Sequence, residues 1–435
     1  MKVVIMAGGK GTRISSINSE VPKPMIPIEG VPVLEREIEG LRRQGFTDII
    51  ITVSHLGHLI MDYFGDGKAF GVDIEYYFEE VPLGNAGALY KLLDKLGDDF
   101  LLLNADAIFD VDFNRFVSYH KSHGELVTLF THPNSHPYDS GLIIANDDGV
   151  VTQWLTKEND RPGYYRNRVN AGLHVINTKL LYNSGIDPEL IGKKNDAGDY
   201  FRVDLDRQLL KPLSGTGKMY AYDSPEYVKD MGTPERYESV CRDYREGIVT
   251  AKNLKSPQKA IFLDRDGTIN KYVGFLRDID EFELIEGVAE AIKTMNTLGY
   301  LVIVVTNQPV IARGEVSQEE LQEIHNKMET LLGFEGAYID AIYYCPHHPD
   351  RGFEGERIEY KIECECRKPK PGMLFKAAED YNIDLSKSYM LGDSESDLQA
   401  GIAAGCNVAF IGQKENVKER QYSSLLDFVN NILLA

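Results

Sequence analysis

The chain has 435 residues, of which 43% are hydrophobic and 26% are charged, and this length and composition suit a globular protein of two or three domains. The formal net charge of −20 argues against nonspecific nucleic-acid binding, which depends on basic surface, although a few local Lys and Arg side chains can still hold a small anion. The apolar run after Lys2 ends at Gly8, too early for a signal peptide, and no apolar run is long enough to span a bilayer. We therefore expect a cytoplasmic protein with no membrane or nucleic-acid partner.

Strand-like apolar runs alternate with helical stretches along the chain. The predicted strands include residues 3–6, 49–53, 100–103, 260–263, 301–305 and 408–411. This alternation is typical of parallel sheets that are covered by helices. The expected fold class is α/β, with two Rossmann-like domains, each a mainly parallel sheet with helices on both faces.

The boundary between the two domains is expected near residue 250. Residues 234–245 have the amphipathic pattern of a helix, and a polar stretch follows before a new strand begins at Ala260. A candidate phosphate-binding loop directly follows the first strand on each side of this stretch. We therefore expect an N-terminal domain over 1–247, a linker over 248–258 and a C-terminal domain over 259–435.

The first predicted strand runs into a glycine-rich loop. Its candidate anion-binding residues are Gly8, Gly9, Gly11 and Thr12. Glycines let the backbone approach an anion and direct successive N–H groups toward it. Arg13 and Lys23 could add positive charge for a triphosphate. Taken alone, the loop is equally compatible with an ordinary strand-to-helix turn.

Longer motifs give a more specific indication of the function of this region. Residues 8–13, 22–25 and 30–34 together resemble the signature of the sugar-1-phosphate nucleotidylyltransferases. The resemblance continues at residues 83–87, 103–106, 157, 170–172 and 230–234. It implies an enzyme that joins a sugar 1-phosphate to a nucleotide and releases pyrophosphate.

The same resemblance implies roles for single residues. The loop with Gly84, Asn85 and Gly87 would hold the nucleobase, and Lys157, Asn170 and Gly172 would contact the sugar phosphate. Asp106 and Asp230 would bind Mg²⁺, Arg13 would hold the leaving pyrophosphate, and Lys23 and Lys157 would hold the incoming phosphate. Ala105 and Asn85 stand where the family usually has Gly and Thr, which leaves the nucleobase and the sugar open.

The second predicted domain begins with a strand that ends in acidic residues. Asp264 and Asp266 follow this strand directly, two positions apart, and Gly267 and Thr268 come next. An acidic turn or a calcium loop could show this short pattern, but the later residues do not have the spacing of a calcium loop. With residues 304–308, 367–371 and 390–397, the pattern resembles the haloacid-dehalogenase-type phosphatases.

The phosphatase resemblance implies a covalent mechanism. Asp264 would attack the phosphorus, and Asp266 would protonate the leaving oxygen and then activate water. Thr306 and Lys368 would steady the transferring group. Mg²⁺ would be bound by Asp264, Asp266 and Asp393, while Asp397 would support the metal shell or Lys368. Further substrate contacts are expected from Asn307, Arg313 and Arg367.

Three of the five cysteines lie close together in the C-terminal half. The set Cys345, His347, Cys364 and Cys366 offers three thiolates and one imidazole, which suits a closed structural Zn²⁺ site, with His348 as the alternative imidazole. This pattern fits a metal site in a reducing compartment better than a disulfide framework. We expect zinc to hold the loop 349–363 over the active site. The zinc loop resembles the branch of the phosphatases that includes heptose bisphosphate and histidinol phosphatases.

The two resemblances together imply a bifunctional enzyme of nucleotide-sugar biosynthesis. The C-terminal site would remove the 7-phosphate of a heptose 1,7-bisphosphate, and the N-terminal site would join the heptose 1-phosphate to a nucleotide, with GTP favoured. Three alternatives stay open. They are another nucleotide and hexose phosphate, a C-terminal histidinol phosphatase, and a degenerate transferase half that acts as a regulatory binding module.

Overall fold

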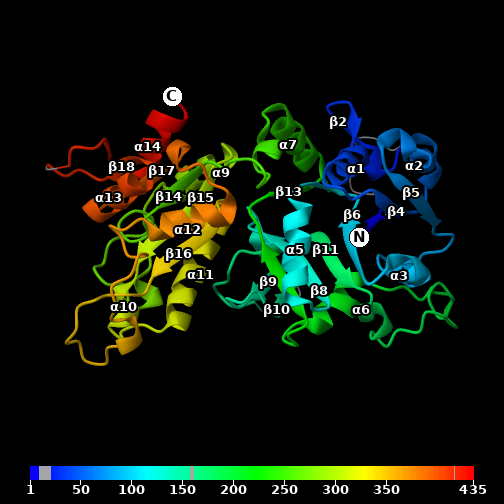
Figure 1. The fold of residues 1–435 in the computed structure, drawn as a ribbon, viewed down its shortest axis with the longest axis horizontal. Helices are drawn as coiled ribbons and strands as arrows, with labels where there is room; N and C mark the ends of the chain where they lie inside the picture. Colours follow the sequence, from blue (N-terminus) through cyan, green and yellow to red (C-terminus); the bar gives the residue numbers. More distant parts are fainter. Residues whose placement is uncertain (9–20, 157–160, 416) are drawn as a thin grey trace. The chain divides into compact units, whose positions relative to one another are not determined.

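The computed structural model describes residues 1–8, 21–156, 161–415 and 417–435, which form two compact units (Figure 1). The first unit consists of Met1–His132, Ile143–Leu155 and Asn170–Asn253, and the second of Pro133–Leu142, Thr156–Val169 and Leu254–Ala435. Two segments of the expected N-terminal domain therefore belong to the second unit. None of the helices in the described ranges has the length and apolar character needed to cross a membrane.

The main sheet of the first unit has a parallel centre and an antiparallel flank. Its strands follow the order β10, β9, β11, β6, β1, β4 and β5, with β8 paired to β11 and β12 paired to β8. Strand β1 is parallel to β4 and β6, whereas β11 is antiparallel to β6. The bounds are β1 (Lys2–Met6), β4 (Asp48–Val53), β5 (Asp73–Phe78), β6 (Asp99–Asn104), β8 (Val127–His132), β9 (Leu142–Ala145), β10 (Val151–Leu155), β11 (Val169–Asn177) and β12 (Met219–Asp223).

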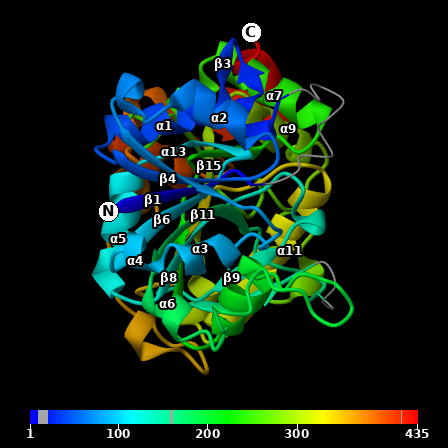
Figure 2. The same cartoon turned by 90° about the vertical axis from the view of Figure 1, so that its right-hand side faces the viewer.

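Helices cover both faces of this sheet because its central strands are continuous apolar runs, such as Val3, Val4 and Ile5. Side chains of α1, α2 and α5 pack on one face, and those of α3, α4 and α6 on the other. Figure 2 shows α1 and α2 on one side of β1 and β6, and α3 on the other. The bounds are α1 (Val33–Arg43), α2 (Gly57–Phe64), α3 (Gly87–Lys91), α4 (Leu93–Leu96), α5 (Phe113–His123) and α6 (Lys179–Tyr182).

A small antiparallel pair, β7 (Ala107–Asp110) and β13 (Tyr227–Asp230), lies beside the main sheet and leads into α7 (Pro234–Arg245). The side chain of Thr233 accepts a hydrogen bond from the backbone N–H of Arg236 and so caps α7. The buried side of α7 packs with the hairpin of β2 (Pro27–Ile28) and β3 (Val31–Pro32). Helix α8 (Ile248–Ala251) lies inside the expected linker 248–258, so this stretch is partly helical.

The second unit is a parallel sheet in the order β16, β15, β14, β17, β18, β19. Helices α9, α11 and α14 pack on one face, and α12 and α13 on the other. The strands are β14 (Ala260–Leu263), β15 (Leu301–Asn307), β16 (Ala341–Cys345), β17 (Tyr389–Gly392), β18 (Asn407–Ile411) and β19 (Gln421–Tyr422). The helices are α9 (Val288–Thr297), α10 (Pro309–Ala312), α11 (Gln318–Phe334), α12 (Gly372–Tyr381), α13 (Glu395–Ala404) and α14 (Leu425–Phe428).

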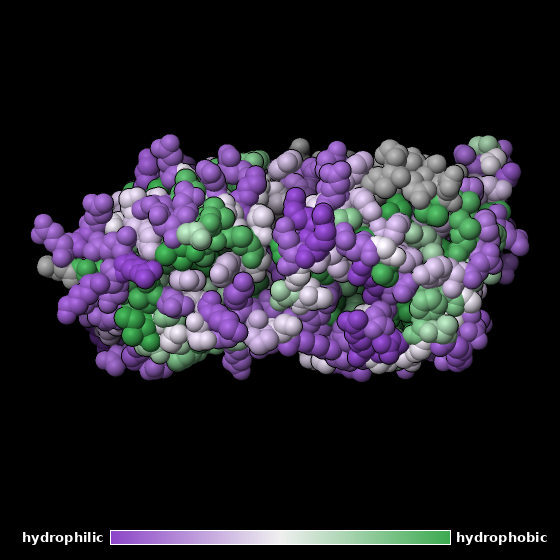
Figure 3. Space-filling view, turned by 90° about the horizontal axis from the view of Figure 1, so that it is seen from above, coloured by the Kyte–Doolittle hydropathy of each residue, from purple (hydrophilic) through white to green (hydrophobic). Residues whose placement is uncertain are grey.

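The expected fold class is confirmed, because each unit has a mainly parallel sheet with helices on both faces. All six predicted strands occur, each with ends within two residues of the prediction, and the predicted helix over 234–245 is α7. Hydrophilic side chains cover much of the face seen in Figure 3, in keeping with the 26% of charged residues.

Candidate active sites

A cavity of about 900 Å³ lies at the carboxyl ends of β1, β4 and β6 in the first unit, where ligands of open α/β sheets usually bind. Six of the predicted site residues line it, namely Gly8, Lys23, Gly84, Asn85, Asp106 and Asp230. Five others, Gly9, Gly11, Thr12, Arg13 and Lys157, lie outside the described residues. The sequence motifs of this half therefore converge on one cavity.

Asp106 and Asp230 come together through the pairing of β7 with β13, in which Asp230 lies opposite Ala107. The Nζ of Lys23 donates to Oδ2 of Asp106 at 2.9 Å, and Nη1 of Arg236 donates to Oδ2 of Asp230 at 2.6 Å. Burial would raise the pKa of Asp230, but the backbone N–H of Gly232 and the charge of Arg236 leave this pKa below its usual value. The carboxylate of Asp230 is therefore suited to remain ionised, and carboxylates such as those of Asp106 and Asp230 are ligands for a hard cation. The sequence did not identify Arg236.

The predicted nucleobase loop is held by the stretch around Val203. The backbone N–H of Val203 donates to the carbonyl of Leu83, and that of Ala86 donates to the carbonyl of Val203. Gly84 has φ +83°, and a Cβ there would lie 2.3 Å from the carbonyl oxygen of Val203, so this close approach requires glycine. Oδ1 of Asn85 accepts from the backbone N–H of Leu205 at 2.7 Å, which explains an amide side chain at this position.

Asn170 and Gly172 lie on β11, beside the end of β6. A Cβ on Gly172 would lie 2.5 Å from Nδ2 of Asn104, a residue that lines the cavity. Oδ1 of Asn170 is 3.1 Å from Nε2 of His174. Burial lowers the pKa of His174 to about 3, so its ring is neutral and can donate to Asn170 through Nε2. His174 fixes the orientation of the Asn170 amide, and no motif pointed to it.

Glu79 is a second cavity residue that the sequence did not identify. It follows the last residue of β5, and a Cβ on Gly8 would lie 2.9 Å from its Oε1. Burial raises the pKa of Glu79 to about 7, although the backbone N–H of Leu83 donates to its carboxylate. A half-buried carboxylate therefore lies between the first glycine loop and the predicted nucleobase loop.

In the second unit, Lys368 lies between two buried carboxylates. Its Nζ is 2.7 Å from Oδ1 of Asp264, just after β14, and 2.5 Å from Oδ1 of Asp397, on α13. Burial raises the pKa of Asp264, and the charge of Lys368 acts in the opposite direction. The structure thus brings the expected nucleophile and the expected lysine into contact, and Asp397 contacts the same lysine.

Asp266 is surrounded by hydrogen-bond donors. The guanidinium of Arg265, which is fully buried, donates to both carboxylate oxygens. Nε2 of Gln308 donates to Oδ2 of Asp266 at 2.8 Å and to Oγ1 of Thr306 at 2.9 Å. Nδ2 of Asn270 donates to Oδ1 at 3.1 Å. These contacts fix the expected acid relative to the hydroxyl of Thr306, and neither Arg265 nor Gln308 had a predicted role.

A carboxylate cluster suited to a metal ion lies beside Lys368. Asp264, Asp393 and Asp397 each offer an oxygen atom within 4.8 Å of the other two. Burial and the charge of Asp397 raise the pKa of Asp393 to about 6, so a cation would favour its ionised form. A Cβ on Gly267 would lie 1.9 Å from Oδ2 of Asp393, and only glycine allows this carboxylate to lie so close to the loop.

Asn307, which we expected to contact the substrate, holds the lysine loop in this structure. Its Oδ1 accepts from the backbone N–H of Lys368, and its Nδ2 donates to the carbonyl of Lys368, both at 3.0 Å. Both polar atoms of the amide are therefore used to hold the lysine loop against the end of β15.

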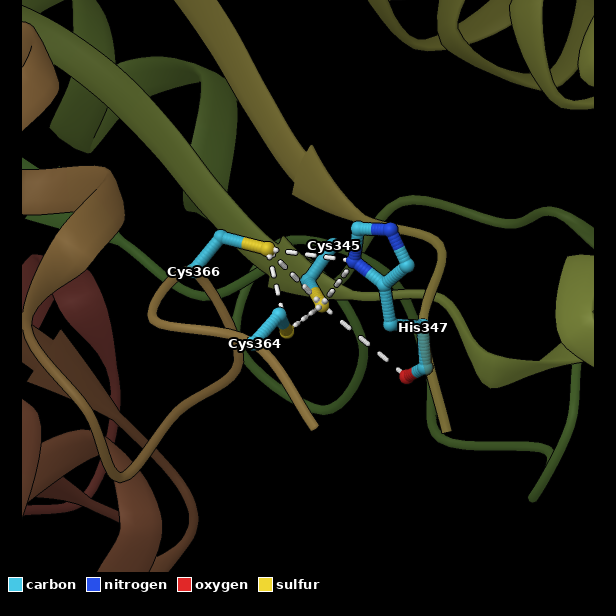
Figure 4. Close-up of side chains that lie close together, drawn as sticks. All are labelled: Cys345, His347, Cys364 and Cys366. Carbon is cyan, nitrogen blue, oxygen red and sulfur yellow. Dashed lines mark hydrogen bonds between the residues drawn. The ribbon is translucent and has the colours of Figure 1, made fainter. Parts of the chain in front are cut away.

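The three clustered cysteines and His347 point toward one another (Figure 4). The distances from Sγ of Cys366 are 3.3 Å to Cys345, 3.2 Å to Cys364 and 3.3 Å to Nδ1 of His347. His348 faces elsewhere, since its Nδ1 accepts from the backbone N–H of Asp350. The geometry favours His347 as the imidazole of a four-ligand metal site.

The loop 349–363 packs against α10 and carries an aromatic and basic surface. The guanidinium of Arg313 lies between the rings of Phe275 and Phe353, at 4.0 and 4.5 Å from their centroids. Its buried Nε has no hydrogen-bond partner among the described residues. Burial and the nearby charges of Arg367, Arg313 and Lys361 lower the pKa of His348, so each of these three cations lies near His348.

The chain matches two family models. The model described as "Nucleotidyl transferase" matches residues 2–247, and the model described as "haloacid dehalogenase-like hydrolase" matches residues 219–405. The first match includes the 900 Å³ cavity, and the second includes Asp264, Lys368 and the carboxylate cluster.

Curated relatives match the C-terminal half. D-glycero-beta-D-manno-heptose-1,7-bisphosphate 7-phosphatase from Yersinia pestis is 40% identical over 174 residues, which are 40% of this chain and 90% of the relative. The protein of the same name from Escherichia coli (strain K12) is also 40% identical over 174 residues, covering 40% of this chain and 89% of the relative.

Two solved structures also resemble parts of the chain. HddC from Yersinia pseudotuberculosis is 24% identical with a TM-score of 0.46, covering 56% of this chain and 99% of that one. D,D-heptose 1,7-bisphosphate phosphatase from B. bronchiseptica is 34% identical with a TM-score of 0.35, covering 41% and 99%. By the family models and the curated relatives, the chain belongs to the nucleotidyl transferase family through its N-terminal half and to the haloacid dehalogenase-like phosphatases through its C-terminal half, and it is both a transferase and a hydrolase.

Proposed function

We propose that the two halves carry out consecutive steps that lead to a GDP-heptose. The C-terminal site removes the 7-phosphate of a heptose 1,7-bisphosphate, and the N-terminal site joins the resulting heptose 1-phosphate to a guanine nucleotide. The observation that carries the proposal is the 40% identity of the C-terminal half to heptose bisphosphate phosphatases over nearly their whole length, in a chain whose other half is a nucleotidyl transferase. A histidinol phosphatase would not supply a substrate to that other half.

In the proposed phosphatase reaction, a carboxylate oxygen of Asp264 attacks the phosphorus of the 7-phosphate. The bond between phosphorus and the sugar oxygen breaks, and Asp266 gives that oxygen a proton. Asp266 then takes a proton from a water molecule, whose oxygen attacks the aspartyl phosphate and releases inorganic phosphate. Lys368 and Thr306 hold the transferring group throughout. Mg²⁺, held by Asp264, Asp393 and the backbone carbonyl of Asp266, would offset the negative charge of the phosphate.

The preference for the bisphosphate rests on Arg313 and Arg367, which both lie near His348. Arg313 is fixed between two rings and keeps an unpaired Nε. A planar guanidinium that is already ordered loses little entropy when it binds a phosphate. We propose that Arg313 and Arg367 hold the phosphate that is not removed.

In the proposed transferase reaction, an oxygen of the sugar 1-phosphate attacks the α-phosphorus of the nucleoside triphosphate, and pyrophosphate leaves. Positioning and charge stabilisation are sufficient for this step, and no covalent intermediate with the protein is needed. Asp106 and Asp230 would hold Mg²⁺, which would supply positive charge to offset the negative charge of the phosphates, and Lys23 and Arg236 contact these two carboxylates. The retention of these four residues around one cavity supports an active site over a degenerate binding module.

The choice of GTP follows from Glu79. A carboxylate accepts hydrogen bonds only, and guanine presents two adjacent donors, N1–H and the N2 amino group. Adenine presents an acceptor at the corresponding position, and the pyrimidines do not present two adjacent donors. Glu79 contacts the predicted nucleobase loop through Leu83. We propose that its carboxylate accepts hydrogen bonds from these two donors of guanine.

Replacing Glu79 with glutamine is expected to raise the KM for GTP by about 10- to 100-fold, since hydrogen bonds to a charged acceptor contribute about 1.5–3 kcal/mol. Ionisation of Glu79, with a pKa of about 7, should make the wild-type KM for GTP fall as pH rises from 6 to 8. The variant should lose this dependence. Pyrophosphate release with GTP, ATP, UTP and CTP over this pH range measures both effects. A wild type that prefers another nucleotide would contradict the assignment.

We also propose that Cys345, His347, Cys364 and Cys366 bind a structural zinc ion. Four soft ligands around one point fit the tetrahedral geometry of Zn²⁺ and leave no open position for chemistry. The ion would fix the loop 349–363, and with it Phe353 beside Arg313. The whole protein is proposed to act in the cytoplasm, where thiols stay reduced.

Replacing Cys366 with serine is expected to remove the zinc and to lower the free energy of unfolding of the second unit by about 4 kcal/mol or more. Metal analysis and chemical unfolding measure the two effects. Cys406→Ser is the matched control, because Cys406 lies outside the cluster. Retention of one zinc per chain in Cys366→Ser would contradict the assignment.

A further inference from the structure

Two segments from the transferase half, Pro133–Leu142 and Thr156–Val169, belong to the same compact unit as the phosphatase sheet. Within that unit they are tied to each other: Nδ2 of Asn167 donates to the carbonyl of Asn134 at 2.7 Å, and the backbone N–H of Asn134 donates to Oδ1 of Asn167 at 3.1 Å. Their common partner is the phosphatase helix α11. We call the two segments together the docked segments.

Helix α11 is buried on two sides. Ile324, Met328 and Leu332 pack into the apolar core under the phosphatase sheet. Asn326, Lys327, Glu329 and Thr330 are also buried, with exposed fractions of at most 9%. A helix at the surface of a domain normally exposes such polar residues to water, and the contacts of Glu329 and Thr330 show on which side of α11 the docked segments lie.

A buried ion pair joins this side of α11 to the docked segments. Nη1 of Arg168 lies 3.0 Å from Oε1 of Glu329, with side-chain exposures of 5% and 2%. The same guanidinium donates to the carbonyls of Ile339 at 3.4 Å and Asp340 at 2.8 Å. These two residues directly precede β16. Removing either charge would leave its partner buried and uncompensated. Arg168 is therefore fixed by the phosphatase fold.

Two further contacts restrict the movement of the docked segments on α11. The backbone N–H of Tyr165 donates to Oγ1 of Thr330 at 2.9 Å, and this hydroxyl donates to the carbonyl of Tyr165 at 3.1 Å. A Cβ on Gly333 would lie 2.7 Å from Cγ and 3.2 Å from Cδ of Pro137. The ring of Pro137 is rigid and part of the main chain, so it cannot move aside without its segment.

We propose that Glu329, Thr330 and Gly333 of the phosphatase helix are positioning residues for the transferase reaction. They fix Arg168, and β11 begins at the next residue, Val169. Asn170 and Gly172 follow two and four positions after Arg168. The inference rests on the proposed function and on the expected contact of Asn170 and Gly172 with the sugar phosphate. In this proposal the contacts of α11 act on the transferase reaction through Arg168 and the strand that follows it.

The first test is Gly333→Ala in the full chain. Alanine favours a helix more than glycine does, so α11 itself is not weakened, but the added Cβ displaces Pro137. The KM for sugar 1-phosphate in nucleotidyl transfer should rise about tenfold, with kcat within about twofold, because a small displacement of a binding group is costly. Phosphatase kinetics should not change. Gly40→Ala in α1 is the matched control, since a Cβ there meets nothing within 4 Å.

The second test is a double-variant cycle with Arg168→Met and Glu329→Leu. Each single variant leaves a buried charge and should raise the KM, whereas the double variant leaves an apolar contact and should return within about threefold of the wild type. Hydrogen exchange gives a readout that needs no substrate: amides of β11 should exchange about tenfold faster in Gly333→Ala than in the wild type.

Unchanged KM and unchanged exchange in Gly333→Ala would overturn the inference, as would single variants that lower both activities equally. If the wild type transfers no nucleotide to any sugar 1-phosphate, the proposed function fails instead. In that case the exchange of β11 amides still decides whether α11 positions this strand.

Discussion

Replacing Asp264 with asparagine is expected to lower phosphate release from heptose 1,7-bisphosphate by about 10⁴-fold or more, because an amide cannot form the aspartyl phosphate. Asp264 is buried and in contact with Lys368 at 2.7 Å, so no neighbouring carboxylate can take over its position without moving that lysine. Nucleotidyl transfer from GTP to heptose 1-phosphate should keep its wild-type rate. Phosphate and pyrophosphate release, measured separately on the full chain, give the two rates.

Asp280→Asn is the matched control for this variant, because it makes the same substitution at an exposed position. It should leave both reactions unchanged. Phosphate release within about tenfold of the wild type in Asp264→Asn would show that another group carries the chemistry.

Replacing Asp106 with asparagine is expected to have the reciprocal effect. Nucleotidyl transfer should fall on the order of 10³-fold, because a metal ligand is lost at the point where two anions must meet. The variant also removes the negative partner of Lys23, which lies 2.9 Å from Asp106. Phosphate release from the bisphosphate should not change.

Asp62→Asn, at an exposed position on α2, controls for the loss of one negative charge in the same unit. Transfer that survives within about tenfold in Asp106→Asn would rule out a central role for this carboxylate. Equal loss of both activities would instead indicate a general effect on folding.

The sequence was sufficient for the parts of the fold that depend on local patterns. Continuous apolar runs predicted the central strands, such as β1 and β14, because buried parallel strands need apolar residues on both faces. The amphipathic pattern of 234–245 predicted α7. Asp264 and Asp393 of the phosphatase motifs lie close together because they follow the neighbouring parallel strands β14 and β17.

The docked segments could not be predicted in this way. The polar residues of α11 around Glu329 have the pattern of a solvent-exposed face, and their burial depends on partners about 160 positions earlier in the chain. The contact of the Asn307 side chain with the backbone of Lys368 could not be predicted either, because the two residues are 61 positions apart in the chain. Glu79 and Arg236 lacked a motif of their own, and only the cavity identifies them.

One chain is expected to convert a heptose 1,7-bisphosphate into a nucleotide-linked heptose, and ³¹P NMR of the protein with this substrate, Mg²⁺ and GTP can follow both steps. The 7-phosphate signal should disappear first, and a sugar-linked diphosphate signal and pyrophosphate should then appear in equal amounts. A bisphosphate that stays unchanged, with metals bound, would rule out this conversion.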